Sequence, residues 1–355
     1  MYPKMYIYKN RIKENAIALK NICSKKNIKI SGVTKVLCGN PEVAEALKEA
    51  GIDFIGDSRI SNIKKMKNFG INTEFMLLRI PMISEIEELI KYVDITLISE
   101  LETLKKISEQ SIKYNKIQKV IYMVDVGDLR EGVWYESAIN EIEEALTIKN
   151  IKVIGIGTNL GCFGGVIPTK ENMNLLVSIK NKIEEKNNIK FELISGGNTA
   201  ALPLIENNEL PNEINNFRLG ESIICGTDVT NNKKVLGARQ DTVILEAEII
   251  ELKEKPSIPV GKIGFDAFGR VPHFEDKGIR TKAILAIGEQ DISPSGLYPL
   301  DEDIEVLHSS SDHTIVDLTN SKNNYKIGDT IKFKMSYGCM LKASTSQYVE
   351  KIVIK

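Results

Sequence analysis

Short apolar runs alternate with longer amphipathic stretches from about residue 10 to residue 232. The amphipathic stretches, such as 41–51 (PEVAEALKEAG) and 84–93 (SEIEELIKYV), are typical of helices that cover a core. The apolar runs indicate buried strands. They lie at residues 28–35, 53–57, 74–80, 94–99, 119–127, 151–159, 190–197 and 216–220. Eight buried strands that alternate with helices predict parallel βαβ units closed into a (β/α)8 TIM barrel over residues 10–232.

A doubly wound open sheet produces the same alternation of strands and helices, and it is the structural alternative. Sheets of that kind that bind dinucleotides carry a G-x-G-x-x-G motif directly after the first strand. No such motif follows the first apolar run of this chain. The barrel is therefore the preferred interpretation.

After residue 232 the pattern changes. Strand-like runs at 240–255, 282–292, 313–319 and 329–337 follow one another through Gly, Pro and Asp turns without intervening helices. We therefore expect a mostly antiparallel β domain at 233–355. Residues 5–10 (MYIYKN) precede the first barrel helix and also have a strand pattern. The segment 1–9 is accordingly expected to join the β domain.

Charge and cysteine content narrow the class of protein. The 47 basic and 48 acidic residues are interspersed, so no segment has the basic excess that nucleic-acid or membrane binding requires. The five cysteines are scattered without a C-x-x-C pair, which favours a reducing compartment. No run has signal-peptide or membrane-spanning length, and no histidine has a metal-ligand partner at a recognisable spacing. We expect a cytoplasmic protein with no nucleic-acid, membrane or metal partner.

Polar residues at the carboxyl ends of the strands are the candidates for chemistry, because active sites of TIM barrels lie there. These candidates are Lys35, Asp57, Arg79, Asp125, Arg130, Asn159, Asn198, Thr199, Arg218 and Gly220. Apolar neighbours of Lys35 would lower the pKa of its amine and favour a Schiff base, although a surface lysine is the ordinary alternative. Residues 194–201 and 218–226, after strands seven and eight, would form either tight turns or a phosphate cradle. A Schiff-base lysine facing a phosphate cradle is the layout that pyridoxal phosphate (PLP) requires.

The chain resembles the alanine-racemase-type (fold type III) PLP enzymes over nearly its whole length, and it is most similar to the ornithine racemases of anaerobic bacteria. The motifs that carry the resemblance are VTKVLCG (33–39), MVDVGDLREG (123–132), GIGTNLGCFGG (155–165), ISGGNTAAL (194–202), RLGESIICG (218–226), GFDAFGR (264–270) and SSSDHTIVDLT (309–319). The resemblance implies a PLP-dependent racemase that interconverts L- and D-ornithine, or a related basic amino acid, by removing and returning the α-proton. It also implies a homodimer whose subunits share active sites.

The resemblance assigns a cofactor-binding role to eight residues. They are Lys35, Asn159, Asn198, Thr199, Arg218, Gly220, Glu221 and Tyr337. Lys35 would carry PLP as a Schiff base and act as one of two bases. Arg218 would contact the pyridine nitrogen and keep it unprotonated, which favours racemisation over transamination. Asn159 would lie against the cofactor ring.

The remaining assignments concern the phosphate and the substrate. Thr199, the backbone at 220–221 and the Tyr337 phenol would hold the phosphate. Arg130 would lie near the substrate carboxylate or the phenolic oxygen of the cofactor, and Ser311 would bind the substrate.

Two positions depart from the family pattern. Met123 stands where alanine racemases have a lysine that positions the arginine, so Arg130 must be held differently. Phe265 stands where they have a catalytic tyrosine, and Phe cannot accept a proton. The second base is therefore expected from Asp266, His313 or Asp312, in that order. Ordinary turn and surface roles remain open for each.

Two other functions use the same scaffold. Metal-assisted D-amino-acid dehydratases and aldolases carry a His-x-Cys ligand pair that is missing here. Non-catalytic PLP-homeostasis proteins lack a β domain. For a diamino-acid substrate, the distal ammonium would need an acidic partner, and Glu221, Asp291 and Asp128 are the candidates.

Overall fold

The computed structural model describes residues 1–355, which form two compact units. One unit, the barrel, comprises Asn10–Arg239, and the other, the β domain, comprises Met1–Lys9 with Gln240–Lys355. The division thus falls after Arg239 rather than after residue 232. The hairpin of β11 (Thr227–Asp228) and β12 (Lys233–Lys234) accounts for the difference, because it lies within the barrel unit.

The barrel is a closed ring of parallel strands. Its members are β2 (Lys29–Val33), β3 (Phe54–Asp57), β4 (Phe75–Leu77), β5 (Ile95–Ile98), β6 (Gln118–Asp125), β8 (Ile151–Gly157), β9 (Leu193–Ser195) and β10 (Asn216–Leu219). Each strand pairs in parallel with the next, β5 pairs with β6, and β10 pairs with β2, which closes the ring. The predicted barrel is therefore confirmed, and the open sheet is excluded. A short strand β7 (Val133–Trp134) adds to the carboxyl end of β6.

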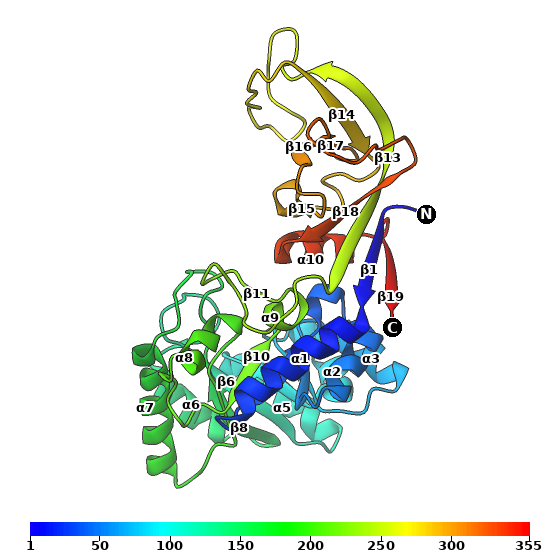
Figure 1. Ribbon diagram of the computed structural model, residues 1–355. Coiled ribbons are helices and arrows are strands. Elements are labelled where there is room, and N and C mark those ends of the chain that lie inside the picture. The colour runs from blue at the N-terminus through cyan, green and yellow to red at the C-terminus, as the bar shows by residue number, and fades with distance from the viewer. The chain divides into compact units, whose positions relative to one another are not determined.

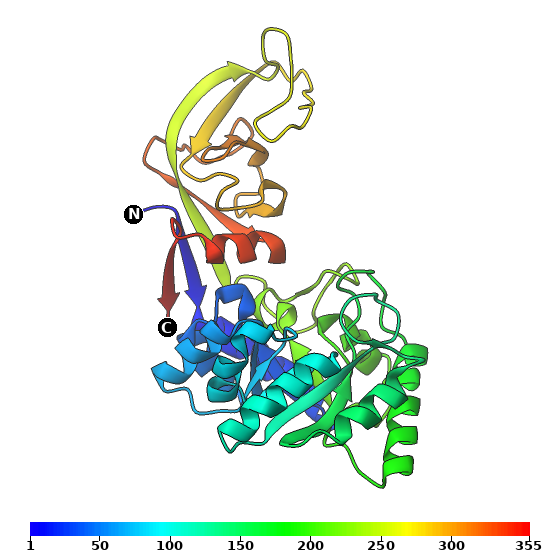
Figure 2. The same cartoon turned by 180° about the vertical axis from the view of Figure 1, so that it is seen from behind.

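Helices lie outside the strands (Figures 1 and 2). They are α1 (Lys9–Ser24), α2 (Pro41–Glu49), α3 (Ile60–Phe69), α4 (Ile86–Tyr92), α5 (Leu101–Lys113), α6 (Ala138–Leu146), α7 (Lys170–Asn187), α8 (Leu202–Glu206) and α9 (Glu221–Ile224). In α5, for example, Leu104 and Ile107 are buried while Lys106 and Glu109 pair on the surface. This one-sided burial is what the amphipathic pattern predicted.

Alternate side chains of the strands fill the ring. Ile121 and Met123 of β6 belong to a buried apolar cluster together with Met76 and Leu97. Tyr122, between them, faces outward and donates a hydrogen bond to Glu141 of α6 at 2.6 Å. The period of two along β6 therefore separates the barrel interior from the helix layer.

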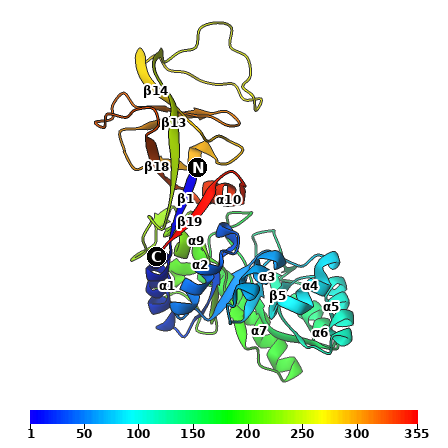
Figure 3. The same cartoon turned by 90° about the vertical axis from the view of Figure 1, so that its right-hand side faces the viewer.

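The β domain is built mainly from antiparallel strands. They are β1 (Lys4–Tyr8), β13 (Val243–Pro256), β14 (Ile279–Leu285), β15 (Leu297–Pro299), β16 (Glu305–Ser309), β17 (Thr314–Asp317), β18 (Thr330–Met335) and β19 (Glu350–Ile354). The strand order is β15-β18-β13-β14-β17-β16, and β1 joins β13. The pair between β1 and β19 is parallel. Figure 3 shows the long connection 257–278 extending beyond β13 and β14.

One helix in the β domain was not expected from the sequence. Helix α10 (Tyr337–Thr345) follows β18, where we predicted strands without helices. The Ser336 hydroxyl accepts a hydrogen bond from the Cys339 amide at 3.3 Å, and Cys339, Met340 and Ala343 are buried on one face. An N-cap and a short apolar stripe are sufficient for a nine-residue helix. No helix in the structure has both the length and the apolar character needed to span a membrane.

Candidate active site

Lys35 begins a 3-10 turn (η1, Lys35–Leu37) just beyond the carboxyl end of β2. Its neighbours Val36 and Leu37 are buried, and the lysine itself is half-buried. Burial lowers the pKa of the Lys35 amine, and the positive charge of Arg130 lowers it further. The neutral amine, which is the nucleophilic form, is therefore more accessible than in a surface lysine.

Asp57 fixes the turn that presents Lys35. Its carboxylate accepts hydrogen bonds from the hydroxyl of Thr34 at 2.8 Å and from the side-chain amide of Asn62 at 2.9 Å. Burial raises the pKa of Asp57 to about 6, although these hydrogen bonds act in the opposite direction. Because Thr34 directly precedes Lys35, Asp57 acts on the backbone at the candidate nucleophile.

Arg218 projects from β10 as a buried cation with 5% exposure. Its Nη2 donates to the carbonyl of Thr158 at 2.7 Å and to Oδ1 of Asn159 at 3.3 Å, and Nη1 donates to the hydroxyl of Ser195. All three acceptors are uncharged, and Nε–H takes part in none of these bonds. Burial lowers the pKa of Arg218 to about 10, so the group remains a cation at neutral pH.

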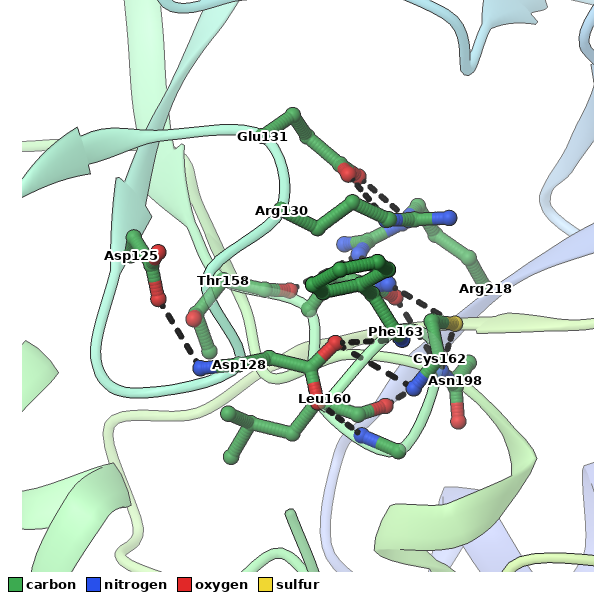
Figure 4. Close-up of polar contacts among 12 residues, drawn as sticks. Asp125, Asp128, Arg130, Glu131, Thr158, Leu160, Cys162, Phe163, Asn198 and Arg218 are labelled. Carbon is green, nitrogen blue, oxygen red and sulfur yellow. Dashed lines mark hydrogen bonds and ion pairs between the residues drawn. The ribbon is translucent and has the colours of Figure 1, made fainter. Parts of the chain in front are cut away.

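A side-chain network follows β8 and β9 (Figure 4). The amide nitrogen of Asn198 donates to Oδ1 of Asn159 at 3.1 Å and to the carbonyl of Leu160 at 2.8 Å. Both asparagines also donate to the sulfur of Cys162, from Asn159 at 3.0 Å and from Asn198 at 3.3 Å. The structure thus brings the two predicted asparagines together with Arg218 and adds a thiol that the sequence analysis did not consider.

Asp128 holds the loop that carries this thiol. Its Oδ1 accepts from the amides of Gly161 and Val166, and its Oδ2 accepts from those of Cys162 and Phe163, at 2.9–3.3 Å. Burial opposes ionisation of Asp128, but the amide hydrogen bonds outweigh it and hold its pKa below the ordinary value. Because both oxygens are engaged, Asp128 organises the loop and does not have an oxygen left for a substrate ammonium.

The predicted phosphate cradle lies at the ends of β9 and β10. Thr199 donates from its hydroxyl to Ser222 Oγ at 3.0 Å and accepts from the Ser222 amide at 3.1 Å. A Cβ at Gly220 would stand 3.0 Å from Cβ of Val33, so only glycine fits without a shift. Of the first two amides of α9, which have no intrahelical acceptor, that of Ser222 already donates to Thr199, and that of Glu221 can serve an anion. Gly197, which precedes Asn198, has a positive φ of 115° that favours glycine.

The side chain of Glu221 is turned away from this cradle. Its carboxylate accepts from the hydroxyl of Thr227 at 2.7 Å and from the amide of Val229 at 2.9 Å, and burial raises its pKa. Glu221 therefore anchors the β11 strand. In the β domain, Asp291 accepts from Ser346 at 2.5 Å. Neither carboxylate is positioned as a free partner for a distal ammonium.

Arg130 is held by its neighbour in the chain. Its Nη2 donates to Oε1 of Glu131 at 2.6 Å, and its Nε pairs with the second oxygen (Figure 4). Met123 lies in the buried barrel cluster. Glu131 therefore holds Arg130 in place, which Met123 cannot do. In the sequence, the only sign of this contact is that Arg130 and Glu131 are adjacent.

The expected second bases lie in the β domain. Asp266 accepts from the amides of Phe268 and Arg270, pairs with the Arg270 guanidinium at 2.8 Å and meets His308 at 3.3 Å. These hydrogen bonds lower the pKa of Asp266 to about 2. Such a carboxylate is a weak base, so the geometry favours a turn-organising role.

The other β-domain assignments form a small cluster and a helix start. His313 Nδ1 lies 3.0 Å from Asp312 Oδ1, and the Ser311 hydroxyl donates to the same oxygen at 3.1 Å. All three lie on the connection between β16 and β17. Tyr337 is the first residue of α10 and is half-buried. Phe265 is 75% exposed on the 257–278 connection.

Several site residues escaped the sequence analysis. They are Cys162, Glu131, Ser195, Ser222 and Thr158, whose buried Oγ1 has no hydrogen-bond partner. For Ser195, Ser222 and Thr158, the placement of a hydroxyl beside a strand end was the only signal in the sequence. No cluster of three or more His, Cys, Asp or Glu side chains could hold a metal ion.

A candidate lysine nucleophile just beyond β2, with a buried arginine and a glycine cradle on the adjacent strand β10, defines a PLP enzyme of the barrel class. The chain belongs to the alanine racemase family: the model of the alanine racemase N-terminal domain matches residues 7–227. It is an amino-acid racemase with pyridoxal phosphate as its cofactor. The resemblance noted in the sequence is thereby confirmed.

Two relatives match over 352 residues, which is 99% of this chain. A lysine racemase of Thermotoga maritima is 48% identical over 98% of its own length. An ornithine racemase of Acetoanaerobium sticklandii is 45% identical over 99% of its length. The crystal structure of alanine racemase from Bartonella henselae with covalently bound pyridoxal phosphate superposes with a TM-score of 0.75 at 18% identity, covering 100% of both chains.

Proposed function

We propose that this racemase interconverts the L and D forms of a basic amino acid, with ornithine or lysine as its substrate. The similarity to a lysine racemase and to an ornithine racemase over nearly the full chain supports this substrate class. The two identities, 48% and 45%, do not separate the two amino acids. Five free cysteines, none of them paired, support a cytoplasmic setting.

The residues at the barrel mouth fit the cofactor. When bound, pyridoxal phosphate joins the substrate amine covalently and makes the substrate α-hydrogen acidic. Lys35 is the residue to which it would be attached, since burial favours the neutral amine. Arg218 is a buried cation whose contacts are all neutral and whose Nε–H is free of them, which suits an uncharged pyridine nitrogen. An arginine there does not surrender its proton to the ring.

The phosphate would be bound by neutral donors. Gly220 leaves room for a close approach, and the amide of Glu221 at the start of α9 is the proposed backbone donor. Thr199 supports this geometry through its two hydrogen bonds with Ser222. Asn159 and Asn198 would border the ring, and Tyr337 of the β domain is the proposed phenol donor.

Arg130 is proposed to bind the substrate carboxylate. Its ion pair with Glu131 orients the guanidinium and leaves Nη1 outside that pair. Ser311 is proposed as a second contact for the substrate. A guanidinium fork matches a carboxylate better than an ammonium does.

We further propose a homodimer with shared active sites. The 257–278 connection exposes large apolar side chains, including Val260 at 98% and Phe265 at 75%. Several large apolar side chains exposed on one connection are typical of a protein interface.

Racemisation needs a proton donor or acceptor in addition to Lys35. Among the residues proposed from the sequence, Asp266 is tied into its turn, while Asp312 and His313 form a hydrogen-bonded pair. All three lie in the β domain, whereas Lys35 lies in the barrel.

One experiment tests the proposed function. The enzyme is incubated with PLP and each L-amino acid in deuterated water, and the chirality and α-deuterium of the product are measured. We expect α-deuterated D-ornithine or D-lysine, with alanine converted far more slowly. A keto acid product, or inversion of alanine alone, would contradict the proposal.

A further inference from the structure

We propose that Cys162 is the acid–base group that works with Lys35, taking or returning the α-proton from across the barrel mouth. The inference rests on the proposed function, since it names a proton carrier for that reaction. Three observations support it: the position of the thiol, the hydrogen bonds to its sulfur, and the contacts that already engage the other candidate bases.

Cys162 and Lys35 emerge from well separated parts of the ring. Lys35 follows β2 and Cys162 follows β8, and the order β2-β10-β9-β8 places these strands three positions apart in a ring of eight. The thiol is exposed in the barrel, unlike the buried Cys23, Cys225 and Cys339. It is therefore accessible to a substrate from a different side than the amine.

The thiol is also electrostatically coupled to the cofactor-binding residues. Burial lowers the pKa of Lys35 and Arg130 lowers it further, whereas a negative charge on Cys162 acts in the opposite direction. Burial also lowers the pKa of Arg218, and the same charge opposes that shift. The thiol therefore lies within electrostatic reach of both residues.

The hydrogen bonds at the sulfur are those that suit a thiolate. Two side-chain amides, from Asn159 and Asn198, donate to Sγ at 3.0 and 3.3 Å. A thiolate accepts such bonds far better than a thiol does. The Cys162 main chain is fixed by the carboxylate of Asp128, which holds four consecutive or nearby loop amides. The position of the sulfur is thus fixed both by hydrogen bonds to the sulfur itself and by hydrogen bonds to the backbone of its loop.

Asn159 links the thiol to the arginine. Its Oδ1 accepts from Arg218 at 3.3 Å while its Nδ2 donates to Cys162 at 3.0 Å. The orientation of this amide is fixed by both neighbours, because exchanging its oxygen and nitrogen would oppose donor to donor at Arg218. Buried Oγ1 of the adjacent Thr158, which has no partner, adds an unused polar group beside this network.

The proton transfers balance. In one direction the Cys162 thiolate takes the α-proton, the Cα–H bond breaks with its electron pair left on the substrate, and the Lys35 ammonium returns a proton to Cα. The enzyme then holds a thiol and a neutral amine. This is the state from which Lys35 takes the α-proton of the other enantiomer and Cys162 returns one. Each direction regenerates the starting state of the other.

The competing groups are less suited to this task. Phe265 has no ionisable group, and Asp266 is held by Arg270 and His308. Asp312 and His313 remain the rival pair. They enter the test as variants.

The first measurement does not depend on turnover. Holoenzyme is treated with iodoacetamide, and alkylation of the Cys162 peptide is followed by mass spectrometry with and without saturating ornithine or lysine. We expect Cys162 to be alkylated and the substrate to slow it at least about tenfold. Cys38→Ala serves as the matched cysteine control. Equal alkylation rates with and without substrate would overturn the proposal.

The second measurement separates the two faces of the reaction. Exchange of the α-hydrogen for deuterium is measured separately from L and D substrate for the wild type, Cys162→Ala and Cys162→Ser. We expect both variants to lose exchange from one enantiomer by ~10²- to 10⁴-fold, which is the range for a general base. Exchange from the other enantiomer should stay within a few-fold of wild type.

Each remaining outcome is decisive. If Cys162→Ala exchanges the α-hydrogen of both enantiomers at the wild-type rate, the role of Cys162 is refuted, while the proposed function is not. Equal loss from both enantiomers identifies a structural role and also refutes it. Selective loss in Asp266→Asn or His313→Gln, with Cys162→Ala normal, transfers the role to the β domain. A wild-type enzyme that exchanges neither enantiomer refutes the proposed function, and the role of Cys162 falls with it.

Discussion

Burial determines the charge state of the residues that face the barrel mouth. Lys35 is shifted toward its neutral amine, Asp57 toward its neutral acid, and Arg218 remains a cation because its ordinary pKa is so high. Lys35 and Asp57 follow the neighbouring strands β2 and β3, and the charge of each affects the pKa of the other. Chemistry at this end therefore depends on desolvation at least as much as on the identity of the side chains.

The raised pKa of Asp57 predicts a pH-dependent stability. A carboxyl with a pKa of about 6 when folded and 3.8 when unfolded binds its proton more tightly in the folded barrel. Stability that is present below pH ~4 should be lost as the pH rises through ~6, on the order of 3 kcal/mol. Asp57→Asn removes this titration. The difference in melting temperature between wild type and variant should change between pH 4.5 and 7, and a constant difference would contradict the assignment.

The ion pair between Arg130 and Glu131 predicts a defect in substrate binding. In Glu131→Gln the exposed guanidinium loses a charged, two-point partner, worth ~0.2–1 kcal/mol for an exposed ion pair. We expect KM to rise about two- to fivefold, with a smaller effect on kcat. The matched control is Glu136→Gln, which changes an exposed glutamate of the same loop region. Equal effects of both substitutions on KM would argue against a role in carboxylate binding.

At the scale of elements, the strands could be predicted well from the sequence. A parallel barrel strand is apolar on both faces and therefore appears as a continuous run of apolar residues. Each of the eight predicted runs overlaps one barrel strand. Helix α10 was missed because its nine residues directly follow a strand and contain only a short apolar stripe. Lys35, Arg218 and the asparagines could be predicted since they end strands. Cys162, Glu131 and Ser222 could not, because their importance arises from contacts between different loops and strands.

The loop 161–166 depends on a single carboxylate. In Asp128→Asn one acceptor oxygen is replaced by a donor, so about half of the hydrogen bonds to the loop amides are lost. Faster hydrogen–deuterium exchange at residues 161–166 and ~1–3 kcal/mol of lost stability are expected. Asp94→Asn is the control, because Asp94 bonds the Phe75 amide at the amino end of the strands. If hydrogen–deuterium exchange at residues 161–166 is unchanged in Asp128→Asn, contacts other than the Asp128 carboxylate hold the loop.

At the scale of the whole molecule, the proposed homodimer follows from the exposed apolar side chains of the 257–278 connection. Phe265→Ser combined with Val271→Ser should weaken association and shift the protein toward monomer in analytical ultracentrifugation. Ile327→Ser, which changes an exposed apolar residue elsewhere in the β domain, should leave association unchanged. A wild type that sediments as a monomer would contradict the proposal.

The central claim is that one half-buried amine, that of Lys35, carries the cofactor. The direct test is to saturate the purified protein with pyridoxal phosphate, reduce it with borohydride and map the modified peptide. The protein contains an internal comparison in Lys116, whose amine also has a pKa lowered by burial but donates to carbonyls of Ile90 and Val93 before β6. We predict one pyridoxyl group, on Lys35, and no visible absorption of a Schiff base in Lys35→Ala. Modification of Lys116 or of surface lysines, with Lys35 untouched, would contradict the account.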